Sequence, residues 1–363
     1  MKYSVIGLMS GSSLDGLDIV FVDIQEISGK WTFEVKAAGC LEYDATWGKK
    51  LQSAIHLPAK EYQLLHTEYG KYLGEKVNEF IEMNHLEHQV NLIASHGHTT
   101  FHCPEKNMTH QLGDGAAIAA ATALPVVSDL RSLDVAFGGQ GAPIVPMGEK
   151  LLFPEHRFFL NIGGIANISI RNGDQFIAYD VCPANRVLNM LSAEINKTYD
   201  DGGQIASTGS VNRELLNELN NLDYFTLSHP KSLANSFGTD IIYPLIKKYG
   251  LRTADSLCTY AEHIAIQIKN SLNPFSSELQ SKNVMITGGG AFNKFVVSRI
   301  QHLLLSINYQ IYIPADEVVN YKEALIMALL GTLRWREQYT VLTSVTGASR
   351  NSVGGALWLG TEA

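Results

Sequence analysis

The feature that most constrains this sequence is a pattern of apolar run, small-residue turn and apolar run that opens each half of the chain. In the first half, residues 3–22 (YSVIGLMSGSSLDGLDIVFV) carry the turn at 10–16. In the second half, residues 158–170 (FFLNIGGIANISI) carry it at 163–167. Apolar runs bounded by clusters of Gly, Ser and Asn are typical of hairpin strands. We therefore expect a β-hairpin at the start of each half.

The two halves also resemble each other farther along the chain. An apolar run at 91–95 (NLIAS) leads into a histidine-rich loop at 96–102, and another at 284–287 (VMIT) leads into the glycine-rich loop 288–293. A duplicated unit of strands and helices is the simplest explanation of this agreement. The sequence thus predicts an α/β fold in which two related halves bind phosphate between them.

Length and composition set the number of domains and exclude some partners. At 363 residues the chain is longer than one ordinary core needs and suits two domains. We expect a first domain at 1–145, with the tail 340–363 packing back on it, and a second at 146–339. The glycine- and proline-bearing segment 130–146 is the expected crossover between them. A net charge of −8 disfavours nucleic acid and anionic membranes as partners.

Cysteine usage and the chain start indicate the compartment. The four cysteines form no C-x-x-C pair, which favours reduced thiols. Met1 and Lys2 run straight into an apolar strand pattern, without the features of a signal peptide. The most apolar windows are shorter than the roughly 20 residues that span a bilayer. We expect a soluble, cytoplasmic protein.

The first turn suits a phosphate chain. Its glycines and serines, at 10–16, leave backbone N–H groups and hydroxyls without bulky neighbours, and Asp15 or Asp18 would then face a metal ion. The turn lacks the spacing of a Walker loop and is not followed at once by a helix. On the residues alone, an ordinary Ser/Gly hairpin turn is an equal alternative.

Two hydrolase interpretations compete with phosphate binding. A zinc site is suggested by a cluster of histidines and one acid, namely His96, His98, His102, His110 and Asp114. A metal hydrolase would leave the glycine hairpins unexplained. A serine hydrolase centred on Ser10 or Ser12 is a poorer alternative, because the turn is not a strand-to-helix elbow.

Taken together, the motifs resemble those of the anhydro-N-acetylmuramic acid kinases, bacterial enzymes of cell-wall recycling. The matching segments run almost end to end in the family's order. They are 7–18 (GLMSGSSLDGLD), 96–99 with His102, 112–114, 129–146, 161–169 (NIGGIANIS), 179–180, 288–293, 323–324 and 344–349 (SVTGAS). The resemblance implies a two-domain, actin-like ATPase fold, a duplicated ribonuclease H-like unit with mixed sheets and an interdomain cleft.

The resemblance also implies a reaction. Water attacks the anomeric carbon as the anhydro bond opens, and the released hydroxyl takes the γ-phosphate of ATP, which gives N-acetylmuramic acid phosphate. Asp180 matches the family's catalytic base, and a carboxylate is the group needed to take the proton from the attacking water. The implied ligands are an amino sugar, ATP and Mg²⁺, and the family suggests a homodimer.

The resemblance assigns the remaining site residues by the side of the ligand that they face. The cofactor residues are Gly11, Ser12, Ser13, Leu14, Asp15, Gly16, Leu17, Asp18, Gly163, Gly164, Asn167, Gly288, Gly289, Gly290 and Asn293. The sugar residues are His98, Asp114, Arg131 and Glu323, with Arg131 able to pair with the lactyl carboxylate. Asp15 and Asp180 are the expected metal ligands.

Three segments depart from the family pattern. Residues 181–185 read VCPAN where the family has Thr-Gly-Pro-Gly-Asn, so a hydroxyl and two glycines of the second phosphate loop are missing. Residues 231–236 read KSLANS instead of Lys-Ser-Thr-Gly-Arg-Glu, and 129–134 keep only part of a more basic segment. A weakened relative that acts on another sugar, or that senses a sugar or nucleotide, is therefore an alternative.

Overall fold

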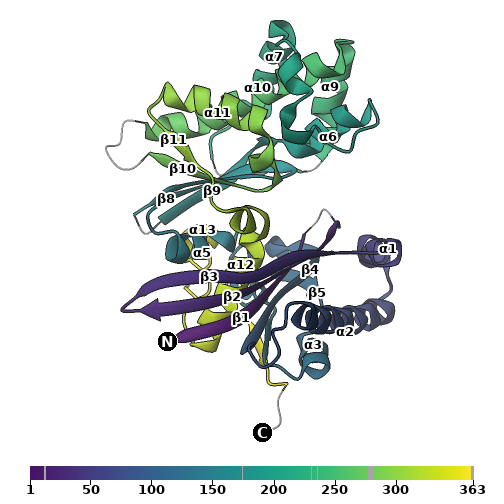
Figure 1. Cartoon of the computed structure of the whole chain (residues 1–363), viewed down its shortest axis with the longest axis vertical. Coiled ribbons are helices and arrows are strands. Elements are labelled where there is room, and N and C mark those ends of the chain that lie inside the picture. The colour runs from purple at the N-terminus through teal and green to yellow at the C-terminus, as the bar shows by residue number, and fades with distance from the viewer. Residues whose placement is uncertain (12–13, 174, 230, 235, 277–281, 361–363) are drawn as a thin grey trace. The chain divides into compact units, whose positions relative to one another are not determined.

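The chain divides into two compact units (Figure 1). The computed structural model describes residues 1–11, 14–173, 175–229, 231–234, 236–276 and 282–360. Unit 1 comprises Met1–Pro154 and Tyr321–Ala363, and unit 2 comprises Glu155–Asn320. These divisions fall at other residues than the boundaries expected after 145 and 339. The segment 130–146, expected as the crossover, lies within unit 1.

Unit 1 is built on a mixed sheet with the strand order β12-β6-β4-β1-β2-β3, in which β5 also pairs with β4. Its strands are β1 (Lys2–Ser10), β2 (Gly16–Ile27), β3 (Lys30–Glu42), β4 (Leu92–Cys103), β5 (Met108–Leu112), β6 (Val126–Ser128) and β12 (Ala356–Trp358). Strand β1 runs antiparallel to β2 and parallel to β4, and β4 runs parallel to β6. The first predicted hairpin is confirmed as β1 and β2.

Unit 2 repeats this plan with the order β11-β10-β7-β8-β9. Its strands are β7 (Phe158–Ile162), β8 (Ile165–Asn172), β9 (Gln175–Pro183), β10 (Asn283–Thr287) and β11 (Gln310–Tyr312). An antiparallel meander, β7-β8-β9, is extended on its other side by the parallel strands β10 and β11. The order and directions match β6-β4-β1-β2-β3 of unit 1. The predicted α/β class with two duplicated mixed sheets is confirmed.

The helices of unit 1 enclose its sheet. They are α1 (Ala45–Ser53), α2 (Ala59–Met83), α3 (Gly115–Thr122), α4 (Ser132–Ala136), α5 (Val145–Leu152) and α13 (Thr343–Thr346), with short 3₁₀ turns at Ala54–His56 and Pro104–Lys106. In α2 the buried residues recur at helical spacing, as the apolar stripe predicts. Helix α12 (Asp316–Trp335) crosses the division at residue 320 and is interrupted at Tyr321, whose φ is −119° and ψ 20°.

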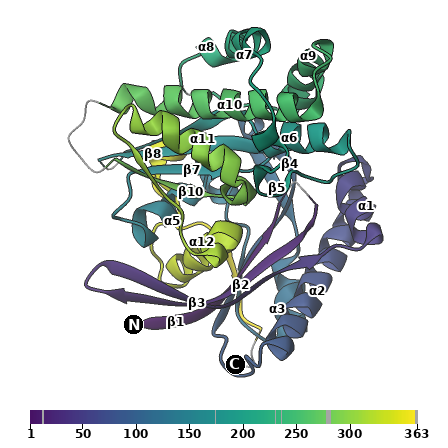
Figure 2. The same cartoon turned by 45° about the horizontal axis from the view of Figure 1, so that its top comes forward.

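The helices of unit 2 pack on one large core. They are α6 (Asn185–Ala193), α7 (Arg213–Asn220), α8 (Asp223–Thr226), α9 (Tyr243–Lys248), α10 (Thr253–Leu272) and α11 (Lys294–Leu305), with a π-helical turn at Phe237–Ile242 and 3₁₀ turns at Asp201–Gly203, Ala206–Thr208, Asn273–Phe275 and Gly289–Phe292. Helices α10 and α11 bury residues against β7, β8 and β10 (Figure 2). In the described part of the chain, no helix has both the length and the apolar composition to cross a membrane.

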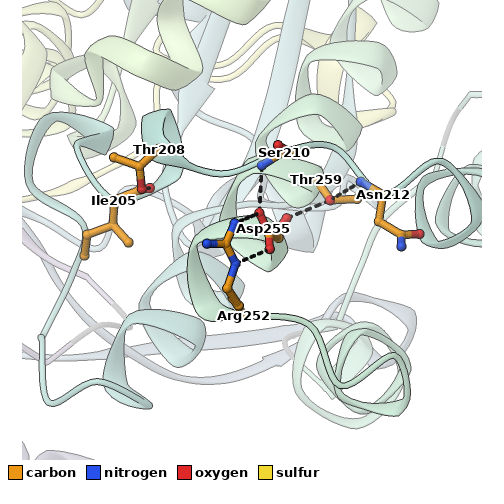
Figure 3. A network of polar contacts seen from close by, with 7 residues as sticks. All are labelled: Ile205, Thr208, Ser210, Asn212, Arg252, Asp255 and Thr259. Carbon is orange, nitrogen blue, oxygen red and sulfur yellow. Dashed lines mark hydrogen bonds and ion pairs between the residues drawn. The ribbon is translucent and has the colours of Figure 1, made fainter.

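Polar contacts fix the start of α10 to the loop before α7 (Figure 3). The Arg252 guanidinium donates two hydrogen bonds to the Asp255 carboxylate, at 2.7 and 2.9 Å. The same carboxylate accepts the Ser210 backbone N–H at 2.8 Å. One turn later, Thr259 Oγ1 accepts the Asn212 N–H at 2.9 Å. This exposed network is structural and orients the central helix of unit 2.

The histidine-rich segment differs from its prediction as a loop. Residues 96–102 continue strand β4, which ends only at Cys103. The extension follows from tertiary pairing, because His98–Cys103 pair antiparallel with Met108–Leu112 of β5. A hydrophobic run alone predicts the buried first half of such a strand, whereas the polar second half is a strand only because a partner satisfies its backbone.

Gly7 lets β1 lie directly against helix α12, and this contact makes a stability prediction. A methyl group at Gly7 would overlap the Ala324 carbonyl oxygen and approach Ala328 N to 2.9 Å. We expect Gly7→Ala to lower the free energy of unfolding by at least about 3 kcal/mol, because helix backbone cannot yield as a side chain can. Urea unfolding measures this.

The matched control is Gly39→Ala in β3, where a methyl group would meet no atom within 4 Å. There the exchange should be neutral or stabilising by up to about 1 kcal/mol. Equal effects of the two substitutions would contradict the close approach of β1 and α12.

Candidate active site

Both ends of the tip between β1 and β2, Gly11 on one side and Leu14 to Gly16 on the other, belong to the described residues. Leu14 has a left-handed backbone, with φ +58°, and its N–H donates to the Gly11 carbonyl at 3.5 Å. Ser12 and Ser13, two of the predicted cofactor residues, lie outside the described residues. At the far end, Gly16 begins β2, where a methyl group would lie 2.5 Å from Cys40 Sγ.

Asp18 is the most perturbed carboxyl near this tip. Its neighbour Leu17 is buried in the core of unit 1, so Asp18 points to the opposite face of β2. Burial raises the pKa of Asp18 to about 6; a hydrogen bond from the Cys40 thiol opposes this shift, and the Asp15 and Glu323 carboxylates add to it. No cationic side chain of the described residues contributes. A divalent cation would relieve this concentration of negative charge.

A chain of hydrogen bonds orients His98. The Tyr43 hydroxyl donates to Ser10 Oγ at 2.8 Å and lies 2.6 Å from the Tyr69 hydroxyl, and Ser10 Oγ lies 3.1 Å from His98 Nδ1. When each hydroxyl donates once, the chain runs from Tyr69 through Tyr43 and Ser10 to His98 Nδ1. Burial lowers the pKa of His98. The imidazole is then neutral and carries its proton on Nε2.

Arg131 and Glu323 lie in one electrostatic neighbourhood. Arg131 donates from Nε to His96 Nε2 at 2.8 Å and from Nη1 to the Gly141 carbonyl at 2.7 Å. His96 Nδ1 lies 2.9 Å from the Gly97 carbonyl, so His96 is a neutral acceptor towards Arg131. Burial lowers the pKa of Arg131 to about 10, and Glu323 opposes that shift. The guanidinium stays charged at neutral pH.

Asp114, the fourth predicted sugar residue, caps a helix and lines a cavity of unit 1. Its carboxylate accepts the Ala116 N–H at 2.9 Å and caps helix α3. It also lines a cavity of about 190 Å³ together with His66 and His110, and Ser95 Oγ in its wall is buried without a partner among the described residues. The other three predicted sugar residues do not line this cavity.

The glycine turn between β7 and β8 binds the start of α6. The Gly164 carbonyl accepts the N–H groups of Ala184 and Arg186, at 2.8 and 3.4 Å, and the Gly163 carbonyl accepts that of Asn185 at 3.0 Å. A methyl group would come no closer than 3.5 Å to other atoms at Gly163 and 3.8 Å at Gly164. A methyl group at either position would therefore make only ordinary van der Waals contacts, and packing does not require glycine there.

In the glycine triplet after β10, unlike the turn at Gly163 and Gly164, packing requires glycine at some positions. Gly288 has φ +81°, and a methyl group there would lie 2.5 Å from Asn161 Oδ1. A methyl group at Gly290 would overlap the Ile162 side chain. Gly289 alone of the three would accept a methyl group in ordinary contact, with Asn185 Nδ2 3.7 Å from the methyl position. Two of the three glycines are thus required by the strand-to-helix turn itself.

A cavity of about 380 Å³ lies beside Gly289. Its walls come from α6, the loop after it and the glycine-rich turn, and consist of Asn185, Leu188, Asn189, Tyr199, Asp200, Asp201, Gly202, Gly289, Phe292 and Asn293. Asn293 also caps α11 by accepting the Val296 N–H at 3.0 Å. Tyr199 and Phe292 expose 58% and 40% of their surface, which leaves two aromatic rings available at the cavity.

Asp180 lies near the end of β9 and is held by the segment that follows α8. Its carboxylate Oδ2 accepts the Leu233 N–H at 2.8 Å, and its backbone N–H donates to the Lys231 carbonyl at 3.2 Å. The Tyr224 hydroxyl donates to the Asp180 carbonyl at 2.6 Å. Burial raises the pKa of Asp180, and the Leu233 hydrogen bond opposes this. In β8, Asn167 pairs with Asp180 in the sheet.

The histidines do not assemble a zinc site in the described residues, where no three His, Cys, Asp or Glu side chains are arranged to hold a metal ion. Each ring has its own partner instead. His96 bonds with Arg131, His98 with Ser10, His102 with Thr109 and His110 with Tyr62.

Comparison with known proteins decides between the remaining interpretations. The sequence profile "Anhydro-N-acetylmuramic acid kinase" matches residues 3–360. This chain belongs to the anhydro-N-acetylmuramic acid kinase family. A relative of that name from Hydrogenovibrio crunogenus is 33% identical over 97% of both chains. One from Sulfurovum is 32% identical over 99% of both.

A solved structure with a similar arrangement is the activator of the 2-hydroxyisocaproyl-CoA dehydratase from Clostridium difficile with bound ADPNP. It is 16% identical and covers 93% of this chain and 96% of its own, with a TM-score of 0.47. The family assignment rests on the sequence matches, which make the chain a sugar kinase.

Several residues of the candidate site were not predicted from the sequence. Tyr199, Phe292 and Asn189 line the larger cavity, and Tyr43 belongs to the His98 chain. Phe292 lies in the glycine-rich segment 288–293, whereas the other three lie on segments with no motif of their own, so only the fold brings them to the site. Arg186 carried a visible signal, because it begins a helix with no acidic residue three or four positions later.

The raised pKa of Asp18 predicts a pH-dependent stability for the kinase. Between the unfolded value of 3.8 and about 6 the folded state binds more protons, so this carboxyl makes the protein less stable as pH rises through that window. We expect Asp18→Asn to raise the free energy of unfolding by about 1–2 kcal/mol at pH 7.5, after allowance for partial exposure, and by little at pH 4. Urea unfolding at both pH values measures this.

Asp23→Asn on the same strand is the control of opposite sign. Burial raises the pKa of Asp23, but bonds to Lys2 and Ser4 outweigh it and the net pKa is lowered. This substitution should destabilise at pH 7.5. If Asp18→Asn lowered the free energy of unfolding at pH 7.5, this would contradict the claim that the ionised Asp18 carboxylate destabilises the folded protein.

The His98 chain predicts one tautomer in the unliganded kinase. In ¹⁵N NMR, His98 should show a protonated Nε2 and an unprotonated Nδ1 at pH 7, because the Ser10 hydroxyl donates its hydrogen bond to Nδ1. Ser10→Ala should shift the ring towards the tautomer mixture of the exposed His56. A protonated Nδ1 in the wild type would refute the direction of the chain.

Proposed function

We propose that this kinase uses ATP and water to open anhydro-N-acetylmuramic acid and to phosphorylate the sugar during peptidoglycan recycling. The observation that carries the proposal is the full-length family match combined with a half-buried, oriented carboxylate at the matching base position, Asp180. A cytoplasmic location, where ATP is available, is part of the proposal. A homodimer, as the family suggests, is part of the proposal.

Asp180 is proposed as the general base. The Leu233 N–H fixes Oδ2, so the other oxygen is oriented to accept a proton from water. A base that acts near neutral pH works best when its pKa is raised towards that pH, and burial raises the pKa of Asp180. As the water attacks the anomeric carbon, its proton passes to Asp180, and the sugar oxygen freed from the anhydro bond accepts the phosphoryl group.

The larger cavity of unit 2 is the proposed site for the nucleoside part of ATP. Its volume of about 380 Å³ and its two exposed aromatic rings, Tyr199 and Phe292, suit a purine. Asn185 lines this cavity, and its backbone N–H also bonds the Gly163 carbonyl. The phosphate chain is therefore proposed to run from the cavity to the open turn at Gly163 and Gly164.

The carboxyl groups near the first tip fit Mg²⁺, which prefers oxygen ligands and is often held by one or two carboxylates with substrate phosphates. Asp18 is half-buried, has a raised pKa, and lies close enough to Asp15 for their charges to interact. Mg²⁺, when bound, would neutralise charge on the phosphates. Asp180, the other predicted metal ligand, belongs to unit 2.

The sugar is proposed to contact Arg131, Glu323 and His98. Arg131 Nη2 has no partner among the described residues and is available to the lactyl carboxylate. The His98 Nε2–H is a neutral donor for a sugar oxygen. Asp114, the fourth predicted sugar residue, is proposed to act through the smaller cavity that it lines.

A weakened relative that acts on another sugar or senses a ligand is the second candidate, and the altered segment 181–185 favours it. Turnover separates the two. The proposed kinase yields ADP and the ring-opened phosphosugar from ATP, Mg²⁺ and anhydro-N-acetylmuramic acid. A sensor would bind nucleotide or sugar without product.

Asp180→Asn is the direct test of the base. We expect kcat to fall by roughly 10²–10⁴-fold with nucleotide affinity unchanged, because the amide cannot accept the proton. Coupled ADP release measures kcat and calorimetry measures affinity. The control is Asp240→Asn, a carboxyl in the π-helical turn of the same unit, which should keep full activity. Retention of more than a tenth of wild-type kcat in Asp180→Asn would reject Asp180 as the base.

A further inference from the structure

Arg186 is a cation without a counter-charge. It lies in the first turn of α6, and its Nε is buried with no hydrogen-bond partner among the described residues. No carboxylate of the described residues pairs with its guanidinium, whereas Arg252 and Arg299 both form bidentate pairs. Arg186 is half-buried, and a cation left unpaired there costs free energy unless a ligand supplies the partner. The side chain is therefore suited to bind an anion.

The position of Arg186 indicates where that anion would lie. Its backbone N–H donates to the Gly164 carbonyl at 3.4 Å, and its Nε is 3.9 Å from the place that a methyl group on Gly164 would occupy. The Arg186 side chain thus lies beside the turn at Gly163 and Gly164. An anion that contacts the arginine would therefore lie close to this turn.

The neighbouring residue connects this turn to the larger cavity. Asn185 lines the cavity of about 380 Å³, and its N–H bonds the Gly163 carbonyl. A molecule with an uncharged ring system in the cavity and an anionic chain reaching the turn would satisfy both features. A nucleoside di- or triphosphate has this chemistry.

We infer that Arg186 binds the phosphate chain of the nucleotide and replaces the hydroxyl and backbone contacts that segment 181–185 has lost. The inference rests on the proposed function, in which the chain uses ATP. A planar guanidinium contacts phosphate oxygens through two parallel N–H donors and also carries a positive charge. A backbone loop supplies N–H donors without that charge. In the altered loop, an arginine side chain then takes the place of the hydroxyl and backbone groups that bind phosphate.

Calorimetry with ATP, ADP and adenosine tests the inference on the full chain. We expect Arg186→Met to weaken ATP and ADP binding by roughly 10- to 100-fold, the range for hydrogen bonds to a charged group, and to change adenosine affinity less than twofold. Arg186→Lys should recover part of the loss, since it restores charge without the planar fork. Arg213→Met, which removes an exposed arginine of the same unit, is the matched control and should bind all three ligands as the wild type does.

Melting of the unliganded protein separates a binding role from a structural one. Because the cation is unpaired, Arg186→Met should leave the unliganded Tm unchanged or higher, while the rise in Tm on adding ATP shrinks. Unchanged ATP affinity in Arg186→Met would overturn the inference and leave the kinase proposal intact. A parallel loss of adenosine and ATP affinity would also overturn it, as a structural effect. Failure of the wild type to bind ATP would instead refute the proposed function.

Discussion

Three backbone hydrogen bonds hold the proposed nucleotide site of unit 2 together. The carbonyl groups of Gly163 and Gly164 accept the N–H groups of Ala184, Asn185 and Arg186, and so join the β7–β8 turn to the end of β9 and the start of α6. Because these three bonds join main-chain groups, the junction does not depend on the hydroxyl and the glycines that segment 181–185 lacks. The same junction brings Asn185 to the cavity and Arg186 to the turn.

Each unit holds a charge that its own residues leave uncompensated. In unit 1, burial and neighbouring carboxylates disfavour ionised Asp18, and in unit 2 Arg186 Nε is buried with no hydrogen-bond partner among the described residues. Such charges lower the stability of the empty protein and favour ligands of opposite charge. A metal cation and a phosphate chain are the two charges that a kinase must bind. The electrostatics of the unliganded protein therefore agree with the chemistry of its family.

Much of the fold could be predicted from local patterns. Alternating and continuous apolar runs with glycine turns predicted both hairpins and the duplication, because strand pairing across a short turn is encoded locally. The second half of β4 could not be predicted, since polar residues become a strand only when β5 pairs with them. The unit divisions depend on contacts between distant segments, and α12 crosses one of them without a compositional signal.

The candidate site divides in the same way. Motif positions such as Asp180 and Gly163 could be read from sequence, but the role of each glycine could not. Packing requires glycine at Gly288 and Gly290, whereas Gly163 and Gly164 would accept a methyl group in ordinary contact. The hydroxyl chain through Tyr43 joins residues more than 30 positions apart, a relation that no local pattern carries.

The central claim is that this chain couples water attack on the anhydro bond to phosphoryl transfer. Mass spectrometry of the product formed from ATP, Mg²⁺ and anhydro-N-acetylmuramic acid in H₂¹⁸O tests it most directly. The account predicts a phosphosugar with one ¹⁸O atom at the anomeric carbon, none in the phosphate group, and one ADP per sugar. A phosphate group that carries ¹⁸O, or ADP formed without a phosphorylated sugar, would contradict it.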